Sequence, residues 1–314
     1  MPVFRRKAAI GLVAALLVLA ACQNQSTSPS PSAAANSAAA SPSQAAVASP
    51  VATVPDNQLV TAGLLTICSD IPYPPQEFFD EAGNPTGSDI DIADEIAKRV
   101  GLEPRVENSV FDTIIAALTG GKCDIIASAQ NITDDRLGQV NMIPFFKAGQ
   151  SFVVAKGNPA GIKTELDLCG KKVAAESGTT EADYVKGTGG YAGAGLNKKC
   201  TDGGKAAVDL QEFQKDSDAL LALSAGQVDA YFADSPVAGY YTVQQPDQFE
   251  LSGVTVEVAL EGISVAKDHK ELGDAVAAAL LSMVNDGTYV QILTKYGLQD
   301  SAVTADEVVV KTGS

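Results

Sequence analysis

The sequence has little of what metal sites, hydrolase triads and nucleic-acid interfaces are made from. Its 314 residues include one histidine, no tryptophan, and 22 lysines and arginines against 38 acidic residues. His269 lies among charged residues in KDHKE, so a histidine-based zinc site or a Ser-His-Asp triad is hard to build. The formal net charge of −16 repels nucleic acid and anionic lipid headgroups. We therefore expect no metal, no cofactor and no nucleic acid among the partners of this chain.

The first 21 residues have the pattern of a secretory signal peptide. Basic residues at 5–7 precede an apolar run at 8–19, which is too short for a comfortable membrane span. The run ends in Leu-Ala-Ala-Cys, which resembles a bacterial lipobox, and Cys22 would then be lipid-modified and become the mature N-terminus. The alternative is an ordinary signal peptide followed by an incidental cysteine. Residues 22–56 are rich in Ser, Ala and Pro and are predicted to form a disordered tether, which places the globular part outside the cytoplasm, close to a membrane.

Four further cysteines lie in the part predicted to be exported. An even number in an oxidising compartment favours two disulfides over metal ligation, and no CxxC spacing argues otherwise. Three pairings are possible. Cys68 ends one strand-like run and Cys123 opens another, while Cys169 and Cys200 flank a second αβ segment, so we prefer Cys68–Cys123 and Cys169–Cys200. Loops of this size would each contribute roughly 4 kcal/mol on the chain-entropy model.

From residue 63 the pattern alternates between strands and helices. The first set is a strand at 64–68, a helix at 90–100 ended by Gly101, a short strand near 104–106, a helix at about 111–118 and a strand from 125. This order predicts a parallel sheet with right-handed crossovers. A second set follows residue 151, with strands in FVVAK, KKVAAES and AAVDLQEF and a helix at 217–223. The chain then returns through GISVAK and ends in helices at about 271–285 and up to Tyr296. Two similar α/β units in series suggest two lobes with a cleft between them.

Polar residues follow the buried strand at 125–127, at the edge where open α/β sheets bind ligands. Thr133 suits a helix N-cap, and Arg136 follows within the first turn. An arginine beside free backbone amides can hold a planar carboxylate with two hydrogen bonds. The alternative is that Arg136 pairs with Asp134 or Asp135 on a solvated helix face.

A carboxylate occupies the matching edge of the second unit. The apolar run 230–233 ends in Asp234, so opposite charges on facing edges would fit a zwitterion. The alternative for Asp234 is a helix N-cap. The turn Ser177–Thr180 exposes amides and hydroxyls that could bind an anion, or it is an ordinary capping motif. Tyr73, Phe78 and Phe111 could lie over a ligand side chain or belong to the core.

Taken together, these segments resemble the extracellular solute-binding proteins of family 3, the amino-acid-binding lipoproteins of bacterial ABC importers. The matching stretches are SDIPYPPQEF, GSDIDIADEIAKRVG, FDTIIAALTGGKCDIIASAQNITDDR, GKKVAAESGTT, ALLALSAGQVDAYFADSPVA, GISVAK and DGTYVQILTKYGL. The resemblance implies an α/β, two-lobed periplasmic-binding-protein-like fold, each lobe a mixed, mostly parallel sheet flanked by helices, with two hinge crossovers. Lobe 1 would comprise 57–148 and 259–300, lobe 2 would comprise 149–258, and 301–314 would be a C-terminal tail.

The resemblance also implies roles for individual residues. The α-carboxylate of an amino acid would be held by Arg136, helped by Asn131 and Thr180. The α-ammonium would be held by Asp234 and by the backbone around Ser128 and Ala129. The ligand side chain would be flanked by Tyr73 and Phe111.

Three acidic residues lie on segments that face the cleft in this fold: Asp70, Glu77 and Glu176. No unassigned lysine or arginine lies on those segments, which argues against a glutamate or aspartate ligand. A basic or polar amino acid such as arginine, lysine, histidine or glutamine is favoured. The alternative is that these acids point to water.

The predicted function is capture of a free polar amino acid and its delivery to an ABC permease by a monomeric, lipid-anchored binding protein with no catalytic activity. One alternative is an exported dehydratase of the prephenate or arogenate type on the same fold, for which Glu176 is the candidate acid or base. Another alternative is an amino-acid sensor that acts through a separate membrane partner.

Overall fold

The computed structural model describes residues 49–191 and 193–313. The predicted signal peptide, Cys22 and most of the tether lie outside the described residues. The last part of the predicted tether packs on the domain: Val51 N donates to Arg99 O at 2.9 Å, and Ala52 and Val54 lie against the core.

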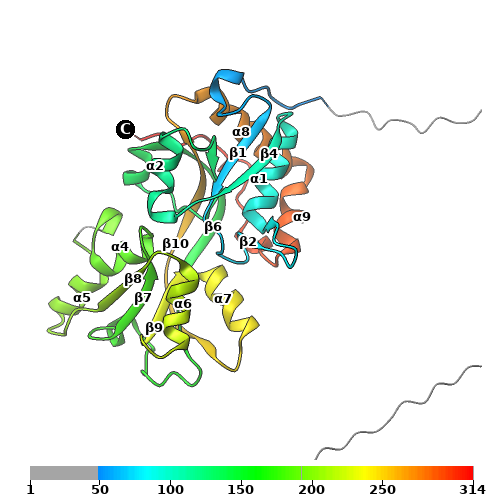
Figure 1. The fold of residues 1–314 in the computed structure, drawn as a ribbon. Helices are drawn as coiled ribbons and strands as arrows, with labels where there is room; N and C mark the ends of the chain where they lie inside the picture. Colours follow the sequence, from blue (N-terminus) through cyan, green and yellow to red (C-terminus); the bar gives the residue numbers. More distant parts are fainter. Residues whose placement is uncertain (1–48, 192, 314) are drawn as a thin grey trace, which may run out of the picture. The chain divides into compact units, whose positions relative to one another are not determined.

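One eight-stranded sheet runs through both lobes in the order β4-β1-β5-β10-β6-β9-β7-β8 (Figure 1). Its strands are β1 (Leu64–Ser69), β4 (Glu103–Asn108), β5 (Ile125–Ile126), β6 (Val140–Ala155), β7 (Lys172–Glu176), β8 (Asp209–Phe213), β9 (Ala230–Asp234) and β10 (Phe249–Ala266). A separate two-stranded ribbon consists of β2 (Phe78–Phe79) and β3 (Pro85–Thr86). The α-helices are α1 (Ser88–Arg99), α2 (Ile114–Thr119), α3 (Asp134–Leu137), α4 (Thr180–Lys186), α5 (Leu196–Asp202), α6 (Asp216–Ser224), α7 (Ser235–Gln244), α8 (Lys270–Asp286) and α9 (Thr288–Lys295).

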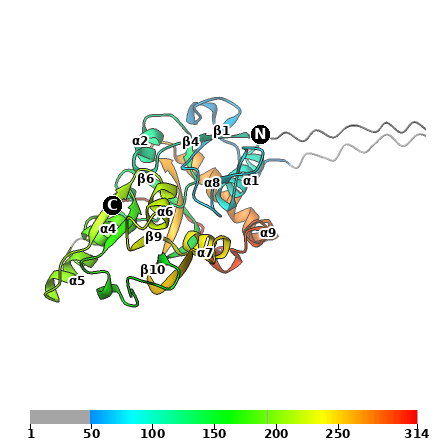
Figure 2. The same cartoon turned by 60° about the horizontal axis from the view of Figure 1, so that its bottom comes forward.

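Lobe 1 is built on β1, which pairs in parallel with β4 on one side and β5 on the other, as the strand-helix alternation predicts. Five of the six residues of β1 are buried, which is typical of a central strand covered on both faces. Helices α1, α8 and α9 lie together in this lobe (Figure 2). The segment after residue 300 also belongs to it, because Val303 and Val308 are part of the core and Lys311 bridges to Met142.

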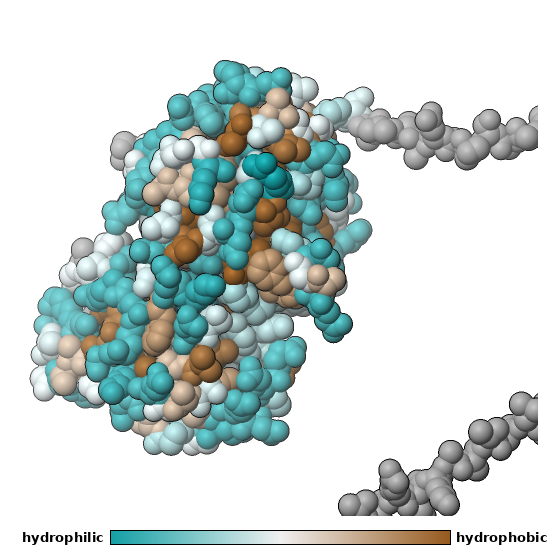
Figure 3. Space-filling model, in the orientation of Figure 1, coloured by the Kyte–Doolittle hydropathy of each residue, from teal (hydrophilic) through white to brown (hydrophobic). Residues whose placement is uncertain are grey.

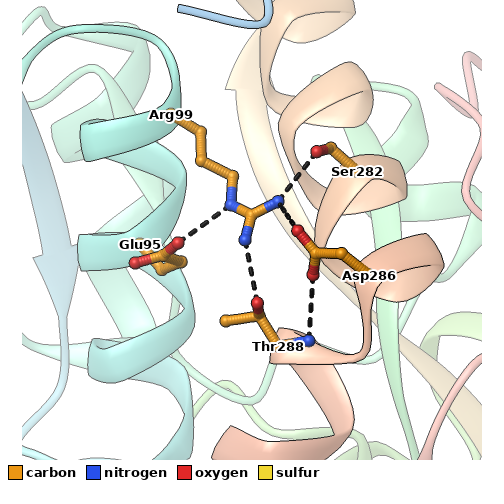
Figure 4. Close-up of polar contacts among 5 residues, drawn as sticks. All are labelled: Glu95, Arg99, Ser282, Asp286 and Thr288. Carbon is orange, nitrogen blue, oxygen red and sulfur yellow. Dashed lines mark hydrogen bonds and ion pairs between the residues drawn. The ribbon is translucent and has the colours of Figure 1, made fainter. Parts of the chain in front are cut away.

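A charged cluster joins α1 to the junction of α8 and α9 (Figure 4). Arg99 Nε donates to Glu95 at 2.9 Å, and its two terminal nitrogens reach Asp286, Ser282 and Thr288. The hydrogen bond from Arg99, and then the one from Thr288 N, lower the pKa of Asp286 to about 2. Arg99 therefore holds three helix ends of lobe 1 together.

Lobe 2 repeats the arrangement, with β7 paired in parallel to β8 and to β9. Its core includes the stacked rings of Phe152 and Phe232, whose centroids lie 3.8 Å apart. Parallel strands carry their carboxyl ends to one edge, so the ends of β7 and β9 are directed toward the same region.

The lobes share two long antiparallel strands, β6 and β10, which pair over most of their lengths. The sequence predicted short strands at FVVAK and GISVAK, and that was wrong in extent: these are parts of strands of 16 and 18 residues. The register shifts between Leu251 and Thr255, between Val256 and Ala259, and between Glu261 and Gly262. Such shifts bend a strand without ending it. The pairing of β6 with β10 therefore continues from one lobe into the other.

Each lobe contains one disulfide. Cys68 is bonded to Cys123 and Cys169 to Cys200, which confirms the pairing preferred from the positions of the predicted strands. The first closes a separation of 55 residues within lobe 1 and the second closes 31 residues within lobe 2. Neither disulfide joins the two lobes, so neither opposes their relative motion.

In the part of the chain that the structure describes, no single helix is long and apolar enough to cross a membrane. Helices α8 and α9, which are bent by 82° at their junction, pass that test only as a pair. The face of the molecule in Figure 3 is mainly hydrophilic, with scattered hydrophobic side chains.

Candidate functional site

A small cavity lies between the lobes. Residues of lobe 1 and of lobe 2 line it: Asp70, Tyr73, Glu77, Phe111, Ala129, Asn131, Arg136, Glu176, Thr179, Thr180, Glu181 and Asp234. Most of these residues follow the ends of β1, β5, β7 and β9, where a mostly parallel sheet presents ligand-binding groups.

Arg136 supplies the one guanidinium in the cavity lining. Thr133 caps the short helix α3 by accepting from Arg136 N at 3.2 Å, as the sequence predicts. The side chain is only 8% exposed, and it donates to Asn131 O at 2.8 Å and to Gly178 O at 3.1 Å. The ring centroid of Phe111 lies 5.4 Å from its central carbon. The guanidinium therefore faces the cavity rather than solvent.

Asp234 lies on the opposite side, at the end of β9. It occupies the N-cap position of α7, but its side chain makes no capping hydrogen bond. Instead its Oδ2 accepts from the hydroxyl of Tyr73 at 2.9 Å, while Oδ1 is buried and accepts no hydrogen bond from the described residues. Burial raises the pKa of Asp234, and the charge of nearby Glu181 raises it further.

Acidic side chains dominate the cavity. Five of its lining residues are acidic, namely Asp70, Glu77, Glu176, Glu181 and Asp234. Burial is the largest cause of the raised pKa of each, and it raises the pKa of Glu176 to about 10. Within the described residues, one oxygen of each of Glu77, Glu176, Glu181 and Asp234 is buried with no hydrogen-bond donor. Buried acceptors of this kind can be satisfied by a ligand rich in N–H donors.

Three direct contacts across the cleft put the lobes in a closed arrangement. Tyr73 of lobe 1 bonds Asp234 of lobe 2, and the Thr180 hydroxyl of lobe 2 donates to Asn131 Oδ1 at 2.6 Å. The third contact runs from Arg136 to the carbonyl of Gly178. The site is complete only when the lobes meet, because each lobe supplies part of its lining.

The sequence as a whole matches the family model of bacterial extracellular solute-binding proteins, family 3, over residues 65–299. This span includes most of both lobes and every residue that lines the cavity. The chain belongs to this family.

Characterised relatives of this family-3 protein bind amino acids. It is 25% identical to the L-cystine-binding protein TcyJ of Escherichia coli over 76% of this chain and 85% of the relative. It is 28% identical to the arginine-binding protein ArgT of Corynebacterium glutamicum over 82% of this chain and 81% of the relative. The structure of an ancestral arginine-binding protein bound to arginine matches with a TM-score of 0.67 and 37% identity, over 75% of this chain and 98% of the other. The chain thus has a substrate-binding role in amino-acid uptake outside the cytoplasm.

Ten of the eleven residues predicted to bind the ligand line the cavity between the lobes. The exception is Ser128, whose hydroxyl accepts from Asp70 N and donates to Glu77 Oε1, both at 2.8 Å. The backbone N–H of Ala129 is also in use, because it donates to Asp89 Oδ2 at 2.9 Å. Ser128 and the Ala129 amide therefore organise the wall of lobe 1, and the acceptors that lack a donor belong to the acidic side chains of the lining.

Thr179 and Glu181 also line the cavity, and the sequence did not single them out as ligand-binding residues. Thr179 caps α4 by accepting from Ala182 N at 3.2 Å. Glu181 lies in the first helical turn, where a carboxylate is expected to interact with the helix dipole whatever its function. The position of Glu181 in the sequence alone does not distinguish a role in stabilising the helix from a role in binding a ligand.

The burial of Asp216, at the start of α6, leads us to expect that the stability of the fold falls as the pH rises. It is buried and accepts from the hydroxyls of Tyr231 and Tyr241, and burial raises its pKa from 3.8 to about 7. A carboxyl with a raised folded-state pKa stabilises the fold below its unfolded pKa and loses that contribution as the pH rises through the folded value. The unfolding free energy of the ligand-free protein should therefore fall by more than about 1 kcal/mol between pH 4 and pH 7.

Urea unfolding at pH 4, 5, 6 and 7 measures this effect. Asp216→Asn should flatten the decline, since the amide oxygen can still accept from Tyr231. The matched control is Asp218→Asn on the exposed face of the same helix, which should leave the pH profile as in the wild type. Identical profiles for all three proteins would contradict the assignment.

Proposed function

We propose that this protein captures a free basic amino acid, arginine in the first place, between its lobes and delivers it to an ABC permease. The observation that carries the proposal is the charge of the cavity lining, with five acidic side chains against one guanidinium. A zwitterion with a neutral side chain brings one positive group to this lining, whereas arginine brings two and adds five guanidinium N–H donors. The arginine-binding relatives support the same choice.

Each charged group of arginine has a counterpart in the lining. The α-carboxylate is held by Arg136, with the hydroxyl of Thr180 beside it. The α-ammonium is held by Asp234 and Glu181. The guanidinium lies between Tyr73 and Phe111 and reaches Asp70 and Glu176.

Ligand capture works through closure of the lobes. In the open state the ligand α-carboxylate binds to Arg136 of lobe 1. Closure of the lobes then brings Asp234, Glu181 and Thr180 of lobe 2 into contact with the same ligand. A ligand stabilises the closed state only through the contacts that it makes there and not in the open state. The protein acts as a monomer, and lipid-modified Cys22 with its tether keeps it near the permease.

A thermal-shift screen of the twenty amino acids tests this function. Arginine should give the largest increase in melting temperature, followed by lysine. A ligand at 100 times its Kd adds about 2.7 kcal/mol to the unfolding free energy. A largest shift from glutamate or aspartate, or no shift with any amino acid, would contradict the proposal.

The raised pKa of Glu176 also fits the general acid of a dehydratase, because a carboxyl with a pKa of about 10 keeps its proton at neutral pH. Binding without turnover is the expected result when the protein is incubated with arogenate. Release of phenylalanine in that assay would show that the site is catalytic.

A further inference from the structure

Two of the cavity carboxyls come from opposite lobes and face each other. Asp70 directly follows β1 in lobe 1, and Glu176 ends β7 in lobe 2. They are 8% and 6% exposed, and both line the same cavity. Since one residue belongs to each lobe, the two carboxyls come together when the lobes close and separate when they open.

Neither carboxyl is neutralised by an ion pair among the described residues. Asp70 Oδ2 accepts from Phe111 N at 2.8 Å, and Lys215 acts on Asp70 only through its more distant charge. Glu176 Oε1 is buried and accepts no hydrogen bond from the described residues. Asp216, which faces Glu176, adds a third carboxyl rather than a cation. Two ionised carboxylates brought together in such a place repel each other strongly.

The other groups around this pair do not supply a cation that would neutralise its negative charge. Tyr231 and Tyr241 donate to Asp216 on the lobe 2 side, and Glu77 adds a further acid on the lobe 1 side. Arg136, Glu181 and Asp234 lie in the same lining, where Arg136 bonds backbone carbonyls. Burial, and then the charge of Asp70, raise the pKa of Glu176 to about 10. Closure without a ligand therefore requires the uptake of a proton.

We propose that the Asp70–Glu176 pair makes lobe closure dependent on positive charge, so that the closed state forms readily only when a cationic ligand side chain or a proton lies between the two carboxyls. This inference rests on the proposed function and goes further, because it assigns specificity to closure rather than to contact alone. A neutral ligand of the same shape leaves the two carboxyls facing each other. It is rejected although every hydrogen bond to its backbone groups is available.

Citrulline distinguishes specificity that depends on charge during closure from specificity that depends on contact alone. It has the shape of arginine, with a neutral urea in place of the guanidinium. At pH 8, calorimetric titration of the wild type should give arginine at least a 100-fold lower Kd than citrulline. In Glu176→Gln, citrulline should bind at least tenfold more tightly than in the wild type, and arginine should bind less tightly. If Glu176 were only a hydrogen-bond acceptor, its removal would weaken the binding of arginine but would not strengthen the binding of citrulline. Unchanged or weaker citrulline binding in Glu176→Gln would overturn the proposal.

Asp247→Asn is the matched control, because it removes one exposed negative charge from lobe 2. It should leave both Kd values unchanged. Asp70→Asn provides a second variant should Glu176→Gln fold poorly, and it should shift citrulline binding in the same direction.

Closure without ligand gives an independent measurement. With one fluorescent label on each lobe, energy transfer should report a larger closed fraction in Glu176→Gln and in Asp70→Asn than in the wild type at pH 8. In the wild type the ratio of closed to open protein should rise by up to tenfold for each unit that the pH falls from 9 toward 6, and this rise should be smaller in Glu176→Gln. Unchanged closure in both variants would contradict the role of the pair. A wild type that closes in this way but binds neither arginine nor lysine would instead refute the proposed function alone.

Discussion

Arg136→Gln is expected to weaken arginine binding about 1,000-fold. The guanidinium is buried and faces the cavity, with its other hydrogen bonds made to two backbone carbonyls. It is the one cation in the lining, so its loss leaves the ligand carboxylate among five acidic side chains. Breaking a buried ion pair by removing one partner costs about 4 kcal/mol, and each 1.4 kcal/mol is a factor of ten in Kd. Isothermal titration calorimetry gives the two Kd values directly.

A matched control for this variant is Arg105→Gln, since Arg105 also lies in lobe 1 but pairs with Glu107 at the surface. That change should leave the Kd within a factor of two. Arg136→Lys keeps the charge but cannot hold a carboxylate in bidentate fashion, so its Kd should lie between those of the wild type and Arg136→Gln. An arginine Kd for Arg136→Gln within tenfold of the wild-type value would overturn the central assignment of the site.

Gly178→Ala is expected to weaken arginine binding roughly 100-fold by obstructing closure. Gly178 lies in the turn between β7 and α4 with a φ of +80°. An added Cβ would lie 2.8 Å from Asp112 Cα and 2.9 Å from Asp112 Oδ1, across the cleft in lobe 1. The first of these contacts is with backbone, which cannot rotate away. Small-angle X-ray scattering with saturating arginine should show a larger radius of gyration than for the wild type.

Gly157→Ala separates the clash from backbone strain. Gly157 also lies in lobe 2 with a φ of +80°, and no atom among the described residues lies within 4 Å of the position of its Cβ. Both variants carry the strain of a left-handed alanine, about 1–2 kcal/mol, but Gly178→Ala alone adds the contact with Asp112. Equal arginine affinities for the two variants would show that close approach at Gly178 is not needed for closure.

Most of the fold could be predicted because local signals and tertiary packing agree. Val100 and the buried Ile92 and Ile96 repeat with helical spacing, and Gly101, at a φ of +75°, follows where the helix ends. The exact form of the helix after residue 110 differs from the prediction, since Phe111–Thr113 form a 3-10 turn before α2 begins. The full lengths of β6 and β10 could not be predicted. They depend on pairing between segments about a hundred residues apart, and shifts in register do not interrupt that pairing.

The candidate site could be predicted where a residue stands at the end of an apolar strand. Asp234 has that position, Arg136 lies in the first helical turn of the segment that follows such a strand, and the structure brings both to one cavity. Glu181 could not be assigned, because a glutamate in the first turn of a helix is favourable without any ligand. The meeting of Asp70 and Glu176 in one cavity lining was equally beyond the sequence. It depends on how closely two lobes approach, and no local pattern encodes that distance.

The most direct test of this account is calorimetric titration of the wild type with L-arginine at neutral pH. We expect one saturable site per chain with a Kd in the micromolar range or tighter, since several charge-assisted hydrogen bonds close on one small ligand. The absence of saturable binding up to about 1 mM arginine, a binding free energy weaker than about −4 kcal/mol, would contradict it.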